Sequence, residues 1–344
     1  MWIRDSPSTI ISLTDNASHS STVLLGLATL DTNGHDLMLA SATSDLKITE
    51  GITINYAGFG GLNSGEADLT LNGSVNVLYG GILSSGGTVT FGAGSSGASF
   101  SEENSGMLLE DTTFVLQTAL DLPYLELSGT SSIQTYGNTL SLGDLEIGVQ
   151  NELDLTNVVT NNESGLRLIG NSAITKTGAL VFKEIGLNGY TLTLNPAITG
   201  LTAKSIHMPN YDSSSTNYLA NTGKIMAQGV DVTLRKQLYL RKGTIEMGGG
   251  TLTLEQGGYL QEDGVLNLSN SVLSLSGPFH NVGNGTLTTS ASTLRLNANV
   301  KFEPQSAVTF DTYEPNGWGM VLGDNSSNLT IGGNVSLQPS AESL

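Results

Sequence analysis

The chain has 344 residues, with 31 acidic against 13 basic side chains, a formal net charge of −18 and no cysteine. This charge repels nucleic-acid backbones and anionic lipids, and the lack of cysteine excludes disulfides, thiolate metal sites and cysteine nucleophiles. The 43 glycines and 38% hydrophobic residues are typical of a folded protein, and an acidic, cysteine-free chain fits a soluble extracellular protein.

The N-terminal segment MWIRDSPSTIISL contains too short an apolar run for a signal peptide. No stretch of 18 apolar residues occurs, so we expect no membrane-spanning helix and no direct insertion into a membrane. If the protein is exported, we expect this sequence to be a fragment that lacks its targeting end.

A glycine followed by an L-x-L pair recurs along the first three quarters of the chain. Variants of this unit stand at residues 34–39, 137–142, 189–194 and 250–254. Within each pair the period of two directs both side chains to one face of a strand. Two polar, turn-rich stretches without alternation, residues 91–106 and 207–223, are predicted to be loops.

From Val232 onward the apolar pairs follow one another every six or seven residues. Pairs that begin at Leu252, Leu273 and Leu294 recur at a constant step of about 21 residues, and Gly, Ser and Asn lie between them. A coiled coil is excluded because each glycine costs a helix about 1 kcal/mol relative to alanine. Short strands joined by tight corners remain, and three sides of seven residues make one coil of a roughly triangular β-solenoid.

The fold class expected is therefore all-β, a parallel β-helix with about 21 residues per coil in the C-terminal half. No composition shift or linker separates independent domains, so residues 1–344 are predicted to form a single β-solenoid domain. Exposed end coils would promote edge pairing, and we expect neighbouring solenoid coils or a capping domain to cover them.

The segments GNTLSLGD, NGYTLTLNP and GGGTLTLEQGG resemble the degenerate repeats of bacterial β-solenoid surface proteins. Autotransporter passenger domains and filamentous-haemagglutinin-like adhesins are families with repeats of this kind. The resemblance implies a right-handed parallel β-helix, a cell-surface or extracellular location, and a role as an adhesin or stalk. A host-surface or glycan ligand is the partner that such a role implies.

Carboxylates are the candidates for catalysis, because β-helices that cleave polysaccharides bring two or three acids together on adjacent coils. Asp121 and Asp144 are separated by roughly the length of one coil, and Glu146 and Asp154 follow. These four could form a cluster on one flank. The alternative is that they decorate a solvated face of an acidic solenoid, which is the interpretation we favour.

The remaining polar residues indicate no metal site and no cofactor. His19, His35, His207 and His280 are scattered without metal-ligand spacing. The segment RKQLYLRK, residues 235–242, could bind an anionic glycan. The 21-residue step instead places Glu262 beside Arg241 and Asp263 beside Lys242, and we favour this structural interpretation.

The strand rhythm breaks at TYEPNGWG, residues 312–319, where Pro, Asn and Gly indicate a turn. Tyr313 and Trp318 flank this turn, and exposed aromatic faces suit sugar rings or a protein partner. The alternative is that Trp318 folds back over a corner and closes the core, which is the interpretation we favour.

The function expected from these observations is a structural or adhesive segment of a bacterial cell-surface or secreted protein, without catalytic activity. The alternative is a polysaccharide-degrading or polysaccharide-binding β-helix. An enzyme should show a long groove with clustered acids on consecutive coils, whereas an adhesin or stalk should show a mostly uniform flank.

Overall fold

The computed structural model describes residues 2–3, 9–12, 17–19, 23–25, 28–31, 37–39, 46–48, 51–55, 61–95, 98–100, 105–207, 223–323 and 329–336. Side chains are described within these segments from residue 62 onward, except at Ser74 and Tyr79. Residues 208–222 of the second predicted loop lie outside this range, as do residues 96–97 and 101–104 of the first. The chain divides into two compact units, residues 1–160 and 161–344, which are described separately.

Unit 1 contains strands of two to ten residues and one short 3-10 helix. Its elements are β1 (Trp2–Ile3), β2 (Thr9–Ser12), β3 (Ala17–His19), β4 (Val23–Leu25), β5 (Ala28–Asp31), β6 (Leu37–Leu39), β7 (Leu46–Ile48), β8 (Gly51–Asn55), β9 (Gly61–Asn63), β10 (Leu69–Leu71), β11 (Ser74–Tyr79), β12 (Gly81–Ser84), β13 (Thr88–Phe91), η1 (Ala93–Ser95), β14 (Ser99–Phe100), β15 (Gly106–Glu110), β16 (Thr113–Leu116), β17 (Leu120–Gly129), β18 (Ser132–Gln134), β19 (Leu140–Val149), β20 (Glu152–Asp154) and β21 (Val158–Val159).

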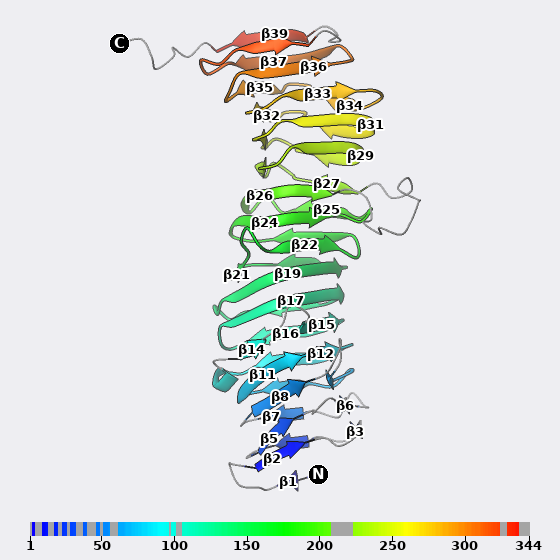
Figure 1. The fold of residues 1–344 in the computed structure, drawn as a ribbon, viewed down its shortest axis with the longest axis vertical. Helices are drawn as coiled ribbons and strands as arrows, with labels where there is room; N and C mark the ends of the chain where they lie inside the picture. Colours follow the sequence, from blue (N-terminus) through cyan, green and yellow to red (C-terminus); the bar gives the residue numbers. More distant parts are fainter. Residues whose placement is uncertain are drawn as a thin grey trace, which may run out of the picture. The chain divides into compact units, whose positions relative to one another are not determined.

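Three parallel sheets form the sides of unit 1. Strands β1, β4, β7, β10, β13, β16 and β18 follow one another in the first sheet, and β2, β5, β8, β11 and β14 in the second. The third sheet contains β3, β6, β9, β12, β15, β17 and β19. From β1 to β15, successive strands enter the first, second and third sheet in turn, so the predicted three-sided coil is confirmed in this part of unit 1 (Figure 1).

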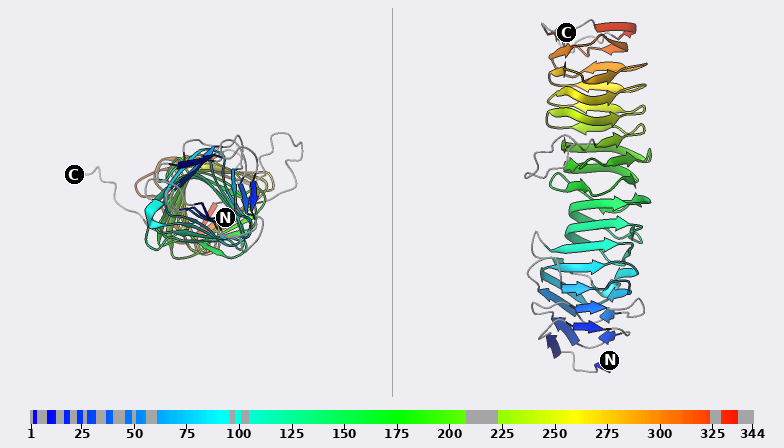
Figure 2. Two further views of the ribbon diagram at one scale, coloured as in Figure 1. Left: turned by 90° about the horizontal axis from the view of Figure 1, so that it is seen from below. Right: turned by 90° about the vertical axis from the view of Figure 1, so that its right-hand side faces the viewer.

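Unit 2 is also built from parallel strands, the longest of them ten residues long. Its elements are β22 (Gly165–Leu168), β23 (Ser172–Thr175), β24 (Gly178–Gly186), β25 (Thr191–Leu194), β26 (Ile198–His207), β27 (Lys224–Met226), β28 (Val232–Leu234), β29 (Leu238–Glu246), β30 (Thr251–Leu254), β31 (Gly258–Asn267), β32 (Val272–Leu275), β33 (Phe279–Val282), β34 (Thr286–Thr288), β35 (Thr293–Leu296), β36 (Val300–Pro304), β37 (Val308–Glu314), β38 (Met320–Leu322) and β39 (Leu329–Val335). Figure 2 shows these strands stacked coil upon coil in the green to orange part of the ribbon.

The core of unit 2 is a set of columns in which each coil contributes one buried residue. Leu201, Val232, Leu252, Leu273 and Leu294 are consecutive register partners, and each is at most 1% exposed. Neighbouring members stand one strand spacing apart, about 4.8 Å. The predicted stacking of Leu252, Leu273 and Leu294 is confirmed. The apolar pairs that recur every six or seven residues therefore mark strands separated by corners, and not the turns of a helix. Within the described residues, no helix is long and apolar enough to cross a membrane.

Corner residues connect one coil to the next through side-chain hydrogen bonds. A backbone amide donates to an Asp oxygen of the preceding coil, as in Thr130 N–H to Asp111 Oδ1 and Thr251 N–H to Asp231 Oδ1, both at 2.7 Å. Asparagine oxygens at positions 171 and 299 accept equivalent bonds at 2.8 and 2.7 Å. Part of the acidic composition therefore satisfies backbone donors that a corner leaves without a strand partner.

Asp111 provides a test of this corner bond. The Thr130 backbone amide, followed by the Thr130 hydroxyl, lowers the pKa of Asp111. A lowered pKa in the folded state adds stability above the usual carboxyl value of about 3.9, and this stability is lost as pH falls through the folded-state pKa. We expect Asp111→Ala to lower the unfolding midpoint at neutral pH.

Asp111→Asn is the matched variant, because asparagine fills the equivalent corner at residues 171 and 299. At neutral pH its unfolding midpoint should stay close to that of the parent. Because the amide does not titrate, the fall of the midpoint with falling pH should be smaller than in the parent by the contribution of Asp111. Thermal unfolding between pH 7 and pH 2 measures both effects. Equal midpoints for the alanine variant and the parent at neutral pH would contradict the structural role of the bond.

Candidate functional site

The four predicted carboxylates occupy three different places in unit 1. Asp144 and Glu146 lie two residues apart on β19, where their register partners on β17 are Tyr124 and Glu126. Asp121 pairs with Ser141, on the far side of Pro123. Asp154 lies on β20 and accepts the Thr156 amide of its own turn at 2.8 Å. Of the four, only Asp144 and Glu146 are close neighbours.

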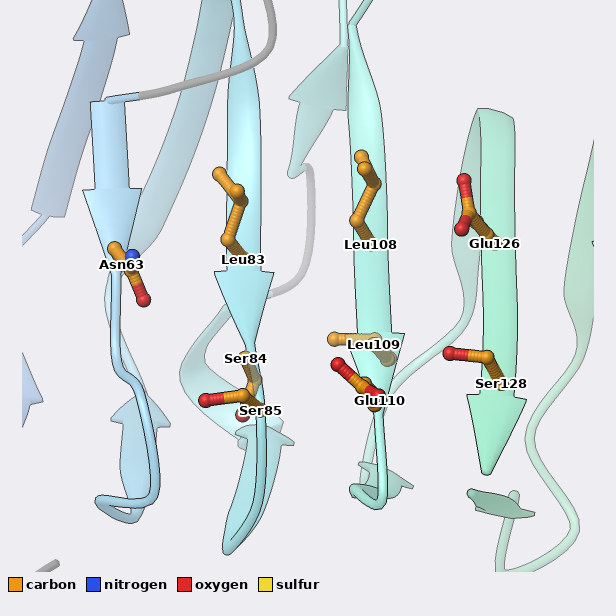
Figure 3. A pocket seen from close by; sticks show the side chains of 9 residues that line it. All are labelled: Asn63, Leu83, Ser84, Ser85, Leu108, Leu109, Glu110, Glu126 and Ser128. Carbon is orange, nitrogen blue, oxygen red and sulfur yellow. The ribbon is translucent and has the colours of Figure 1, made fainter. Parts of the chain in front are cut away.

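The structure instead places Glu126 opposite Glu146, beside a depression on the outer face of the third sheet of unit 1. Asn63, Leu83, Leu108 and Glu126 form one row across four neighbouring strands, as consecutive register partners (Figure 3). Ser85, Glu110 and Ser128 lie further along the same strands. The depression measures about 230 Å³ and is lined by Asn63, Leu83, Ser84, Ser85, Leu108, Leu109, Glu110, Glu126 and Ser128.

The chemistry that this depression offers is hydrogen bonding beside two apolar side chains. The Tyr124 hydroxyl donates to Glu126 Oε2 at 3.0 Å, which fixes one carboxylate oxygen. Leu83 and Leu108 stand in the outward row although they are apolar. Among the described residues, no group of three or more His, Asp or Glu side chains is arranged to hold a metal ion.

The sequence pattern does not single out Glu110 or Glu126, because coil lengths in unit 1 vary. The step from Leu108 to Glu126 and the step from Glu126 to Glu146 are both shorter than the step from Leu252 to Leu273. The constant spacing between register partners in the C-terminal half of the chain therefore does not predict the pairing of Leu108 with Glu126 or of Glu126 with Glu146. The signal that could have found them is the L-x-L alternation of β17 and β19, whose buried positions set the register.

The second predicted site separates into one inward and one outward aromatic residue. Tyr313 is the register partner of Leu294 and of Val335, so it continues the column of buried leucines. Partial burial raises the pKa of the Tyr313 phenol. Tyr313 is therefore part of the packing at this level of the solenoid.

Trp318 closes the predicted turn and is 46% exposed. Its amide donates to the Pro315 carbonyl at 2.8 Å, and Asn316 and Gly317 adopt φ of 50° and 82°. The Asn316 side-chain amide donates to the Leu296 carbonyl of the preceding coil at 3.0 Å, which holds the turn. The interpretation favoured from the sequence, that Trp318 folds back over a corner and closes the core, does not agree with this exposure.

The basic segment 235–242 contributes its aromatic residue to a ladder. Tyr239 stacks on Tyr259 with ring centroids 5.3 Å apart, and Tyr259 stacks on His280 at 4.6 Å. His280 Nδ1 contacts Glu303 on the following coil, and Glu303 also contacts Lys301 at 2.6 Å. Stacking turns the ring faces toward one another, so the ladder stabilises the register and offers few free faces to a sugar.

The register confirms only one of the two predicted charge pairs of this segment. Lys242 and Asp263 are backbone partners. Arg241 lies where the register shifts, and Glu262 there adopts φ of 50°, as in a β-bulge. Among the described residues of unit 2, salt bridges form at other positions, such as Lys224–Glu246, Arg295–Glu314 and Lys301–Glu303.

Comparison of the chain with protein-family models, with curated proteins and with solved structures finds no match.

Tyr313 and Trp318 should differ in their effect on stability. We expect Tyr313→Ala to lower the free energy of unfolding by roughly 1–2 kcal/mol, because a partly buried ring leaves the core column. Tyr313→Leu restores the residue type of the column and should recover most of this loss. Trp318→Ala should stay within about 0.5 kcal/mol of the parent. Denaturant unfolding measures all three variants, and a larger loss for Trp318→Ala than for Tyr313→Ala would contradict the placement of the two rings.

Proposed function

We propose that this chain is a structural or adhesive β-solenoid segment of a bacterial cell-surface or secreted protein. In this proposal the columns of buried leucines supply a stiff scaffold, and the contact with a host surface or glycan is made by Trp318. The chain then has no catalytic role and acts outside the cell or at its surface, in agreement with its acidic, cysteine-free composition.

The observation that carries the proposal is the exposed indole of Trp318 on a fixed turn. Binding surfaces gain most from large aromatic residues that are already held in place, because little conformational entropy is lost on contact. The turn is held by the Trp318 amide and by the Asn316 side chain. Exposed Val321 and Leu322 follow on β38, so further apolar surface lies close in sequence.

A polysaccharide-degrading or polysaccharide-binding β-helix is the second candidate. The facing Glu126 and Glu146, with Glu110 beside the depression, favour it, because glycosidases use paired carboxylates. Release of reducing ends from a panel of polysaccharides, abolished by Glu126→Gln, would support this candidate over the first. The first proposal requires that no such release occurs.

The adhesive proposal is tested by binding to glycan arrays and to host cells. We expect Trp318→Ala to weaken binding more than tenfold, a change of about 1.4 kcal/mol or more. Tyr136→Ala is the matched control, since Tyr136 is 71% exposed on a turn of unit 1. Unchanged binding by Trp318→Ala, or an equal loss in the control, would overturn the assignment of the contact to this turn.

A further inference from the structure

Four exposed basic residues gather at one corner of unit 2, and we refer to them as the basic column: Lys183, Lys204, Arg235 and Lys236. Lys183 and Lys204 face each other, because each lies between the register partners Phe182–Ala203 and Glu184–Ser205 of β24 and β26. The Arg235 amide donates to the Ala203 carbonyl at 3.0 Å, and the Lys236 amide to the Lys204 carbonyl at 2.8 Å. Three consecutive coils therefore present positive charge at the same level.

This arrangement is unfavourable for the isolated protein. Like charges directly opposite each other on neighbouring strands destabilise a sheet. The chain has only 13 basic residues against 31 acidic ones, so a charged register partner of a lysine is expected to be acidic more often than basic. Elsewhere in unit 2 the chain does supply one, as in Lys224–Glu246 at 2.9 Å and Arg295–Glu314 at 2.6 Å.

The carboxylates that flank the basic column do not form salt bridges with it. Glu184 lies next to Lys183 in sequence but contacts His207 Nε2 at 3.5 Å. Glu255 lies on the coil after Arg235, where its amide donates to the Leu234 carbonyl. Within the residues that the structure describes, no salt bridge involves any of the four basic side chains.

Arg235 extends along the column, toward the earlier coils and not toward the coil of Glu255. Its Nη1 donates to Asn162 Oδ1 at 2.7 Å. The Lys183 amide donates to the Ser164 carbonyl, so Asn162, two residues before Ser164, lies on the coil before Lys183. The hydrogen bond from Arg235 to Asn162 therefore crosses the strands of Lys183 and Lys204. The guanidinium is thereby held over the lysines, a preorganised group for an anion.

Small hydroxyl groups also lie beside the basic column. Thr202 and Thr233 are register partners that lie two residues before Lys204 and Arg235, on the same outward face and partly exposed. Ser205 follows Lys204. Hydroxyl groups bind sugars through hydrogen bonds, whereas a peptide segment would require apolar pockets.

We propose that the basic column binds an acidic polysaccharide, a chain that bears a carboxylate or sulfate on successive sugar units. The row of cations repeats at the strand spacing of about 4.8 Å, which suits an extended chain with regularly placed anions. This site is independent of Trp318. The net charge of −18 disfavours nucleic acid, because a duplex extends far beyond the column over repelling surface.

The test measures binding of the full chain to polygalacturonate, to dextran sulfate and to neutral dextran. The parent should bind at least one of the two anionic chains and not the neutral one; the two anionic probes distinguish carboxylate from sulfate as the recognised group. The paired variant Lys183→Gln with Lys204→Gln should weaken binding at least tenfold. It should also reduce the salt dependence, because each neutralised contact contributes about 0.7–0.9 to the slope of log affinity against log salt for linear polyanions.

Two matched variants separate local from general charge effects. Arg241→Gln with Lys242→Gln removes the same charge from another outward part of unit 2 and should bind as the parent does. Lys183→Arg with Lys204→Arg keeps the charge and should retain binding. The glutamine pair at 183 and 204 should unfold no earlier than the parent on heating, because it relieves like-charge repulsion.

The proposal is overturned if the parent binds neither anionic polysaccharide, or binds neutral dextran equally well. It is also overturned if the Arg241 and Lys242 pair causes the same loss, or if duplex DNA binds as tightly as the polysaccharides. Host-cell binding is measured on the Lys183 and Lys204 glutamine pair in parallel. Loss of polygalacturonate binding with host-cell binding retained tells failure of this site apart from failure of the adhesive contact.

Discussion

Parallel, in-register backbone pairing between successive coils is the constraint on which every other feature of both units depends. Once Leu252 pairs with Leu273 and Leu273 with Leu294, all other residues of those coils are placed opposite their counterparts one strand spacing away. Inward positions then form buried columns, and corners recur at the same level. Hydrogen bonds such as Thr251 to Asp231 can form only because the corners are aligned.

The same constraint decides what happens on the outer faces. A side chain that points outward meets its register partner whether or not the pair is favourable. Tyr239, Tyr259 and His280 use this proximity to stack, and Arg295 uses it to pair with Glu314. Lys183 and Lys204 meet with the same sign of charge. In a fold with such regular proximity, an unfavourable column stands out against its neighbours and indicates a ligand.

The fold could be predicted where coil length is constant. The equal steps between Leu252, Leu273 and Leu294 predicted the correct register, and the triangular coil followed from three sides of seven residues. In unit 1 the step from Val89 to Phe114 is longer and the step from Met107 to Leu125 is shorter, because corners differ in length. A constant step therefore does not predict that Glu126 and Glu146 are register partners. The register shift at Arg241 removes the predicted pairing of Arg241 with Glu262. Exposure of Trp318 depends on turn geometry, which the residue types left open.

The register of the leucine columns can be measured directly, because the chain has no cysteine of its own. Thr251 and Val272 are partners on β30 and β32, at a spacing of about 4.8 Å that a disulfide can bridge. Thr251→Cys combined with Val272→Cys should therefore crosslink under mild oxidation. Thr251→Cys with Ser274→Cys places the sulfurs on diagonal positions, about 8 Å apart at the backbone, and should crosslink far more slowly. Equal rates for the two pairs, or faster crosslinking of the diagonal pair, would contradict the register.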